Sequence, residues 1–170
     1  MLKELLTEKR DSIIAGWREA MAGAYPADAA KFLLRKQNRF ANPVGYAINQ
    51  ESAAIFDALA LMEEGGSEVL TASLDNIIRI RAVQELSAAE AISFVYLLKD
   101  VIRRELATEL CDNGLARELL VFESRIDQVA LLAFNVYMNC REQVFRIRTG
   151  EIKKWSSQMS ARSADDSNNK

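Results

Sequence analysis

Acidic side chains are the residues of this chain best suited to chemistry, because two close pairs of them could bind a metal ion on a helix surface. Glu105 lies four residues before Glu109, and Glu63 is followed directly by Glu64. Lysine or arginine lies near most of these carboxylates, so we interpret both pairs as parts of solvated helix faces. Di-iron carboxylate bundles need a glutamate with a histidine three residues on, and the sequence contains no histidine.

The absence of histidine excludes several other kinds of site. An imidazole general base, a histidine-ligated zinc ion, a haem with a proximal histidine and histidine phosphotransfer all need this residue. Gly65 and Gly66 lack the further glycine and the lysine of a phosphate-binding loop, and no nucleophile elbow or dinucleotide fingerprint occurs. We therefore predict no catalytic residues, no metal and no cofactor; an enzyme based on carboxylates and arginines is an alternative.

The two cysteines, Cys111 and Cys140, are too few and too far apart for a metal cage of the paired-cysteine kind. If Cys111 ends one helix and Cys140 lies about 25 residues into the next, antiparallel helix, their sulfurs are on the order of 35 Å apart. This separation excludes an internal disulfide. We expect packed or half-buried thiols in a reducing compartment, and the alternative is a bridge between subunits at Cys140.

The composition indicates one domain without a membrane segment. The chain has 170 residues, 49% of them hydrophobic, which is enough for one core. Its 22 basic and 24 acidic residues leave a net charge of -2, so no overall positive field would attract nucleic acid. The longest apolar run, Val129 to Phe134, is far shorter than the roughly 20 residues that span a bilayer, and Lys3 and Glu4 do not fit a signal peptide. We therefore expect a cytoplasmic protein with no membrane insertion.

Apolar spacing and helix-end signals predict about six helices and no strands. The first helix is expected over residues 2–22 and the second over residues 28–36. Asn42 followed by Pro43 predicts the start of a third helix, because asparagine caps free amide groups and proline already has the first helical dihedral angle. Ser67 predicts the start of a fourth helix.

The last two helices are the clearest in the sequence. Ser87-Ala88-Ala89-Glu90 matches the capping box, so a fifth helix is expected from there to a turn at Asn113–Gly114. A long sixth helix is expected from Leu115 to Trp155. We predict that residues 1–155 form one all-α domain, globin-like or a related helical bundle with a long C-terminal helix, and that the polar residues 156–170 are a disordered tail.

An apolar stripe on this long helix predicts self-association. Its residues follow one another at alternating steps of three and four, the spacing that keeps one stripe facing a partner helix. We predict a homodimer whose interface contains Leu119, Phe122, Ile126, Val129, Ala133, Val136 and Cys140.

Basic residues gather at the end of the same helix, and they are Arg141, Arg146, Arg148, Lys153 and Lys154. These cations either complement the negative end of the helix dipole or dock an acidic surface of a protein partner. Nucleic acid is not expected to bind, because no aromatic platform or basic groove accompanies the charge.

Aromatic residues concentrate in the first third of the chain, among them Trp17, Phe32, Phe40, Tyr46 and Phe56. Ordinary packing in the core and at helix corners accounts for such a cluster. The alternative is that these five residues line a pocket for a small apolar ligand, which would suit a sensor.

Three segments taken together resemble a known family. They are Phe40-Ala41-Asn42-Pro43-Val44-Gly45, the helix from Ser87 with Phe94, Leu97-Leu98, Val101-Ile102 and Glu105-Leu106, and the stretch from Arg141-Glu142 to Lys154. With these segments, residues 2–155 resemble the N-terminal domain of the RsbT co-antagonist (RsbRD-type) family. The resemblance implies a non-haem globin-like sensor domain of stressosome proteins, dimeric in related proteins, whose last helix runs toward an output module. The usual C-terminal STAS output domain does not follow Trp155, so no phosphorylation site is carried over.

We therefore expect a non-catalytic signal-input or adaptor domain that dimerises through its long helix and transmits to a separate protein partner with an output function. A purely structural helical adaptor without a ligand is the alternative. The sequence names neither the signal nor the partner.

Overall fold

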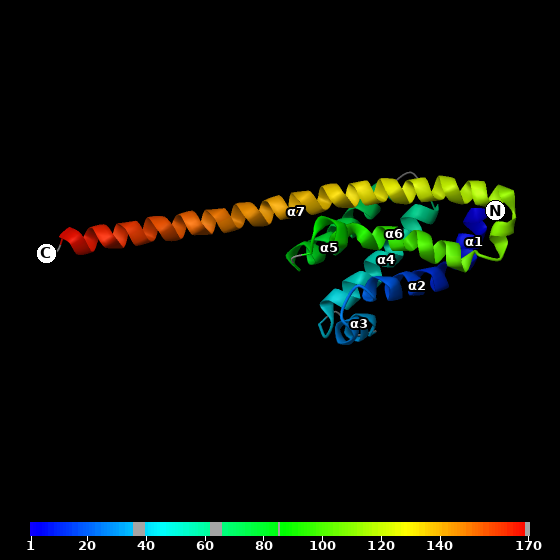
Figure 1. Cartoon of the computed structure of the whole chain (residues 1–170), viewed down its shortest axis with the longest axis horizontal. Coiled ribbons are helices and arrows are strands. Elements are labelled where there is room, and N and C mark those ends of the chain that lie inside the picture. Colours follow the sequence, from blue (N-terminus) through cyan, green and yellow to red (C-terminus); the bar gives the residue numbers. More distant parts are fainter. Residues whose placement is uncertain (36–39, 62–65, 85, 169–170) are drawn as a thin grey trace.

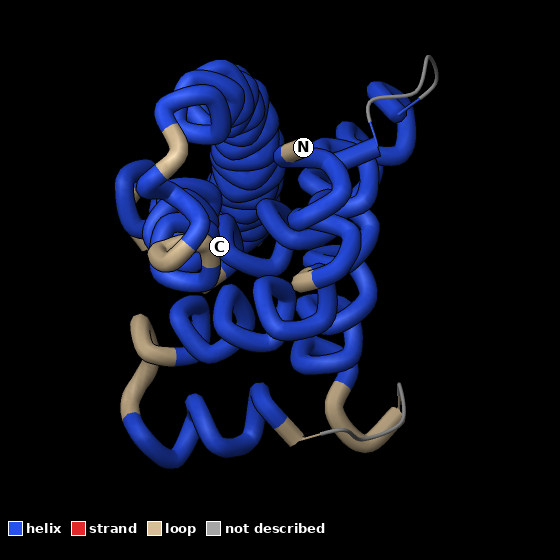
Figure 2. The backbone as a smooth tube through the Cα atoms, turned by 90° about the vertical axis from the view of Figure 1, so that its right-hand side faces the viewer, coloured by secondary structure: helices blue, strands red, loops and turns tan. Residues whose placement is uncertain are grey.

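The computed structural model describes residues 1–35, 40–61, 66–84 and 86–168, and the regular structure of these residues is entirely helical (Figure 1, Figure 2). This confirms the predicted all-α fold with a long C-terminal helix. In chain order the elements are α1 (Leu2–Glu8), α2 (Arg10–Ala22), α3 (Ala27–Leu34), α4 (Pro43–Leu61), α5 (Gly66–Val83), α6 (Ala88–Glu105), a short 3-10 helix η1 (Glu109–Cys111), and α7 (Asn113–Asn168).

The first predicted helix is divided in two at Lys9. The backbone there has φ -93° and ψ 11°, which ends α1 and starts α2. The Lys9 amine donates to the Glu105 carbonyl oxygen and to a Glu109 carboxylate oxygen, both at 2.6 Å. These contacts hold Lys9 against the connection between α6 and α7, which lies about a hundred residues away in the sequence. The residues next to Lys9 in the sequence do not indicate such a tertiary contact, so the division of the helix at Lys9 was not predicted.

The predicted helix start at Asn42–Pro43 is confirmed, and α4 begins there. The Gly45 amide donates to the Asn42 side-chain oxygen at 2.9 Å, while the Asn42 side-chain nitrogen donates to the Phe32 carbonyl at 2.7 Å. Asn42 is fully buried by these contacts. A Cβ atom on Gly45 would lie 2.7 Å from the Leu33 carbonyl oxygen, so only glycine fits between α3 and α4.

The predicted capping box at α6 is also confirmed, because Ser87 and Glu90 each accept a hydrogen bond from the other's backbone amide. The predicted end of this helix is wrong. α6 ends at Glu105, η1 follows, and Asn113 already belongs to α7. The side chain of Asp112 accepts a hydrogen bond from the Gly114 amide at 2.7 Å, so the Asn113–Gly114 dipeptide opens α7 instead of closing α6.

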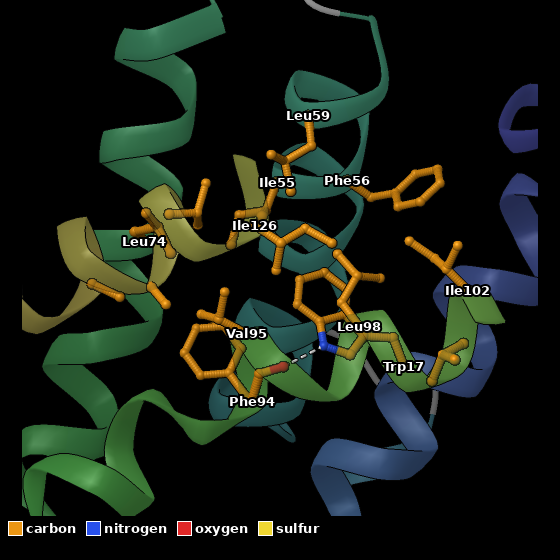
Figure 3. Packing of buried hydrophobic residues seen from close by; sticks show 14 of the residues in the cluster. Trp17, Ile55, Phe56, Leu59, Leu74, Phe94, Val95, Leu98, Ile102 and Ile126 are labelled. Atoms are coloured by element: carbon orange, nitrogen blue, oxygen red, sulfur yellow. Dashed lines mark hydrogen bonds between the residues drawn. The ribbon is translucent and has the colours of Figure 1, made fainter. Parts of the chain in front are cut away.

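The core lies where α2, α4, α5, α6 and α7 meet. Trp17 is fully buried, its ring nitrogen donates to the Phe94 carbonyl at 2.7 Å, and its ring stacks on Phe94 with centroids 6.1 Å apart. Figure 3 shows Ile55, Leu98 and Ile126 converging on this pair from α4, α6 and α7. Burial of such large side chains supplies the main favourable free energy of folding.

A buried arginine joins α5 to α6. Arg81 is only 3% exposed, donates to the Glu90 carbonyl at 2.9 Å, and places its guanidinium 5.5 Å from the centre of the Phe94 ring. Loss of water around this group lowers the pKa of Arg81 from its usual value. The contact connects the end of α5 to the capped start of α6.

The last helix is longer than the bundle it packs on. α7 has 56 residues, which at the usual rise corresponds to about 84 Å. Figure 1 shows it lying along one edge of the bundle and then continuing beyond it. Residues 156–168, predicted to be disordered, continue this helix. No proline and only one glycine, Gly150, follow Gly114 in the sequence, so nothing in this stretch interrupts the backbone hydrogen bonds.

Candidate functional site

The predicted dimer stripe of α7, here called the inner stripe, lies inside the chain's own bundle. Its members Leu119, Phe122, Ile126, Val129, Ala133 and Cys140 are each at most 6% exposed, and Val136 packs half-buried against the same core. α7 makes these contacts with α5 and α6. The spacing correctly located a packed stripe, but the partner helices belong to the same chain, so these residues are not free to contact a second copy.

Two ion pairs fix the position of α7 on α6. The Nε and Nη2 atoms of Arg103 donate to the two Glu123 carboxylate oxygens, at 2.6 and 2.7 Å. The Lys99 amine donates to Asp127 at 2.6 Å. The Glu123 side chain is 8% exposed, while that of Arg103 is 54% exposed. The carboxylate raises the pKa of Arg103 above its usual value, mainly through the hydrogen bonds. These contacts specify one register between the two helices.

Both cysteines are free thiols, but only Cys140 is packed as predicted. Cys111 is exposed near the start of α7, whereas Cys140 is buried in the inner stripe. Burial raises the pKa of the Cys140 thiol. A bridge between subunits at Cys140, the alternative left open by the sequence, would need this thiol to leave the core.

The part of α7 beyond the bundle presents apolar side chains to solvent. We divide α7 into a bundle segment, residues 113–144, and an extended segment, residues 145–168. Every residue from 151 to 159 is exposed. Phe145, Ile147, Ile152 and Trp155 have exposed fractions between 62% and 73%. Large apolar patches on a helix surface mark contacts with another protein, because leaving them in water is unfavourable.

A second apolar line on α7 escaped the sequence analysis. Its members, here called the outer seam, are Leu131, Phe134, Met138, Phe145, Ile152, Trp155 and Met159, with exposed fractions from 40% to 73%. Leu131, Met138, Phe145, Ile152 and Met159 follow one another at steps of seven residues. The signal was present in the sequence, but its first members lie inside the apolar run Val129 to Phe134, and the continuous inner stripe is the stronger pattern.

The five predicted docking cations do not share one face. Arg141 is half-buried and donates to the Ala82 carbonyl at 3.4 Å, and Arg148 lies within the line of the outer seam. Arg146 is exposed and pairs with Glu142 at 2.6 Å. Lys153 follows Arg146 by two helical turns on the same side of α7, and Lys154 is its exposed neighbour. The exposed basic face therefore consists of Arg146, Lys153 and Lys154.

The structure does not bring the five predicted pocket residues together. Trp17 and Phe56 lie in the core, at 0% and 1% exposure, where Figure 3 shows them among aliphatic side chains. Phe32, Phe40 and Tyr46 lie at the surface, with exposed fractions of 44%, 94% and 38%. Ordinary packing in the core and at helix corners, the first interpretation from the sequence, describes these aromatic residues better than the alternative of a shared apolar pocket.

The bundle also has a hollow that the sequence did not indicate. It measures about 460 Å³, lies between α1, α4 and α7, and is lined by Leu2, Lys3, Leu6, Ala60, Glu118, Val121, Phe122 and Arg125. Its walls combine aliphatic side chains with charges of both signs. None of the five aromatic residues lines it.

Glu105 and Glu109, one of the two acidic pairs, are engaged by neighbouring side chains. Glu105 accepts a hydrogen bond from Ser12 at 2.7 Å, and Glu109 pairs with Lys9. The lysine holds the pKa of Glu109 below its usual value. Glu63 and Glu64 lie outside the described residues. Within the residues that the structure does describe, no group of three potential metal ligands is found.

The comparisons with known proteins agree with the resemblance seen in the sequence. The model of the RsbT co-antagonist protein rsbRD N-terminal domain matches residues 11–151. The chain belongs to this family. The rsbRD N-terminal match covers all seven residues of the inner stripe and ends within the extended segment of α7. The family suggests a stressosome-type sensor or signalling domain.

An uncharacterised protein of Archaeoglobus fulgidus is similar to this rsbRD-type chain, with 31% identity over 104 residues. The matched region is 60% of this chain and 65% of that protein, so the chain spans just under two thirds of its relative's length. No solved structure matches the chain. The expected likeness to globin-like bundles therefore stays a prediction. In the described part of the chain, no helix is long and apolar enough to cross a membrane.

Proposed function

We propose that this rsbRD-type chain is a non-catalytic signal-input domain that self-associates and passes a conformational change to a separate protein partner through the extended segment of α7. Continuity of α7 is the observation that carries the proposal. One uninterrupted helix packs on α5 and α6 through its inner stripe and then extends beyond the bundle. A rearrangement of the bundle that shifts α5 or α6 therefore has to move the extended segment as well.

Such a domain could have two states that differ in how α7 packs on the bundle. The side chains of close-packed helices interdigitate. α7 can therefore change its packing arrangement on the bundle only between discrete positions, and not continuously. The ion pairs Arg103–Glu123 and Lys99–Asp127 stabilise one such arrangement. A ligand that binds more tightly to the bundle in a second arrangement of α7 would shift the population toward that arrangement.

The exposed basic face of the extended segment supports an acidic partner. Arg146, Lys153 and Lys154 are all exposed on the extended segment, and Arg146 pairs with Glu142, whose side chain is itself mostly exposed. Charge complementarity would speed the encounter and select the partner, and it would weaken at high salt.

Co-purification from cells that naturally contain this chain tests the proposal. The full chain is compared with the double variant Lys153→Glu, Lys154→Glu. Lys31→Glu with Arg35→Glu is the matched control, because it changes the net charge equally at exposed positions far from α7. We expect an acidic protein to be lost from the α7 variant and kept by the control. Equal recovery by all three chains contradicts the proposed docking face.

A structural adaptor that binds no small molecule is a second candidate. The dispersal of Trp17, Phe32, Phe40, Tyr46 and Phe56 favours it, because these residues form no shared pocket. Native mass spectrometry of the chain purified from its own cells distinguishes the candidates. A bound metabolite of constant mass supports a sensor of small molecules, and a bare chain that still captures its partner supports the adaptor.

A further inference from the structure

The hollow between α1, α4 and α7, here called the α1 hollow, has the composition of a small-molecule site. Its volume of about 460 Å³ falls in the range of roughly 300–1,000 Å³ that ligand pockets occupy. Leu2 and Leu6 line it from α1 and Phe122 lines it from α7, and all three residues are at most 6% exposed. The core holds these side chains in place, so the apolar wall is formed before a ligand arrives.

Helical spacing aligns the wall that α7 contributes. Glu118, Phe122 and Arg125 are separated by four and then three residues, so they lie on the same side of the helix. Figure 1 shows α1 lying beside the first turns of α7. α4 contributes Ala60, whose single methyl group leaves space between the three helices. The two charged residues of the α7 wall are about 10 Å apart along the helix axis.

Glu118 already has a structural role in this wall. Its carboxylate accepts a hydrogen bond from the Leu2 amide at 2.8 Å, which joins the start of α1 to α7. An amide in the first turn of a helix has no partner within that helix, and here Glu118 supplies one. Because this carboxylate serves the chain itself, we do not expect it to select a ligand.

Arg125 has no such role. Within the part of the chain that the structure describes, four arginines form no hydrogen bond or ion pair, and they are Arg35, Arg117, Arg125 and Arg148. The other three are exposed, where water satisfies the guanidinium, whereas Arg125 is half-buried and lines the α1 hollow. A cation that is partly withdrawn from water is stabilised by an opposite charge. The α1 hollow therefore combines an uncompensated positive group with an apolar wall.

This combination suits a carboxylic acid with a compact apolar body. A carboxylate matches a planar guanidinium with two parallel hydrogen bonds, and Lys3 adds a second positive charge to the lining. At about 30 Å³ for each water-sized group, 460 Å³ would hold about 15 groups if the hollow were closed. Its lining includes Val121, which is 58% exposed, so the hollow opens to solvent. A ligand of about ten heavy atoms would fill its inner part.

We infer that the α1 hollow binds a monocarboxylic acid of about eight to ten carbons, with its carboxylate on Arg125 and its apolar body against Leu6 and Phe122. Phe122 belongs to the inner stripe, and the next residue, Glu123, forms the ion pair that holds α7 on α6. A ligand in the hollow therefore contacts the turn of α7 that fixes its packing. The inference deepens the proposed function by naming the chemical class of the signal, and that role of the ligand rests on the proposed function.

Sodium octanoate is the probe, and titration calorimetry on the full chain measures its binding. Arg125→Gln removes a charge that has no partner among the described residues, so the fold should be unaffected. We expect this variant to bind octanoate about tenfold more weakly or worse, because charge-assisted hydrogen bonds are lost. Arg117→Gln is the matched control, since it removes the same charge from an exposed position of α7 outside the hollow. It should bind octanoate like the parent chain.

Two further measurements separate the charge from the apolar body. Octanamide has the same hydrocarbon chain without the negative charge, so it should bind the parent chain and Arg125→Gln equally, and more weakly than octanoate binds the parent chain. Arg125→Lys keeps the charge without the planar fork, and it should restore part of the octanoate affinity.

Chain length and filling of the hollow test where the ligand lies. From butanoate to octanoate, each added methylene should raise the affinity about three- to fourfold, and chains longer than about ten carbons should gain no more, because they reach solvent. Ala60→Met places a flexible side chain in the hollow and should abolish octanoate binding. Ala58→Met, on the opposite side of α4, should not. The urea midpoints of both variants show whether the bundle is intact.

Two results overturn the inference. One is the absence of octanoate binding to the parent chain, and the other is equal binding by the parent chain and by Arg125→Gln or a folded Ala60→Met chain. Neither contradicts the proposed function, because partner capture by Lys153→Glu with Lys154→Glu is measured without octanoate. Octanoate should also change how much partner the parent chain captures, and not how much Arg125→Gln captures. Capture by the parent chain that octanoate leaves unchanged overturns the role of the ligand as the signal.

Discussion

The two segments of α7 have nearly the same apolar spacing and opposite environments. In the bundle segment, Ile126 and Ala133 are fully buried, and Glu123 is fixed by Arg103. In the extended segment, Phe145 and Trp155 are about as apolar and are 69% and 73% exposed. A helical repeat therefore shows that a stripe will be covered, but it does not show whether the cover comes from the same chain.

The difference assigns the two segments different roles. Substitutions in the bundle segment should act on folding, whereas substitutions in the extended segment should act on association and leave folding nearly unchanged. The predictions below compare matched changes in the two segments, and they begin with the largest expected effect.

A charge in the inner stripe should be the most damaging change. Ile126→Asp would place an unpaired carboxylate at a fully buried position, and we expect it to lower the free energy of unfolding by about 3–5 kcal/mol. Urea denaturation followed by circular dichroism measures the loss. Leu120→Asp, at a position on the same segment that is 64% exposed, is the control and should change the free energy by less than about 0.5 kcal/mol. Equal losses would contradict the assignment of the inner stripe to the core.

Ion pairs of similar geometry should contribute differently to the free energy of unfolding in the two segments. Arg103→Ala would leave the buried Glu123 carboxylate without its partner, and we expect a loss of about 1–2 kcal/mol after allowing for the exposure of the arginine. Arg146→Ala removes a pair with Glu142 in which both side chains are mostly exposed, and it should cost less than about 0.5 kcal/mol. Urea midpoints of the two variants give the comparison. A larger effect at Arg146 would show that the extended segment is packed in the monomer.

The capping box adds a dependence on pH to the bundle. Hydrogen bonds from Ser87 hold the pKa of Glu90 below its ordinary value of 4.5. Because the pKa is lower in the folded state, this stabilisation is present above pH 4.5 and is lost as the pH falls through the folded pKa. We expect the urea midpoint of the parent chain to fall more steeply below that pH than the midpoint of Glu90→Gln.

Glu151→Gln is the control for this pH series, since it removes an exposed carboxylate from the extended segment. It should keep the steep fall of the parent chain. If the urea midpoints of Glu90→Gln and of the parent chain fall in parallel as the pH is lowered, the capping carboxylate does not contribute to the acid sensitivity.

The smallest effect is expected at Gly150, in the middle of the extended segment. A Cβ atom added there meets nothing within 4 Å, so Gly150→Ala should only raise helix propensity, by about 0.5–1 kcal/mol locally. Circular dichroism should report more helix, while the urea midpoint of the bundle stays the same. Gly16→Ala is the contrasting change in the bundle, because its Cβ atom would lie 2.8 Å from the Arg104 guanidinium and 3.2 Å from Val101.

Features that depend on neighbouring residues in the sequence were predictable. The starts of α4 and α6 were located from Asn42–Pro43 and from Ser87 with Glu90, because each cap is completed within three residues. The family was identified from short helical segments, and the all-α fold followed from apolar spacing and the absence of alternating strand patterns.

Features that depend on distant residues were not predictable. The break at Lys9 depends on Glu105 and Glu109, and the end of α6 at Glu105 depends on how the chain turns into α7. The inner stripe was located correctly and given the wrong neighbour, because spacing does not identify the covering helices. The aromatic residues were grouped by their closeness in the sequence, and the fold separates Phe56 in the core from Phe40 at the surface.

The unbroken backbone of α7 has a mechanical consequence. Residues 145–168 are rigidly continuous with the part seated on the bundle, and they form an arm of about 36 Å. A tilt of about 5° where the helix leaves the bundle would displace the far tip by about 3 Å. Under the proposed function the helix would act as a lever, and its length would determine how far a small repacking of the core moves the tip.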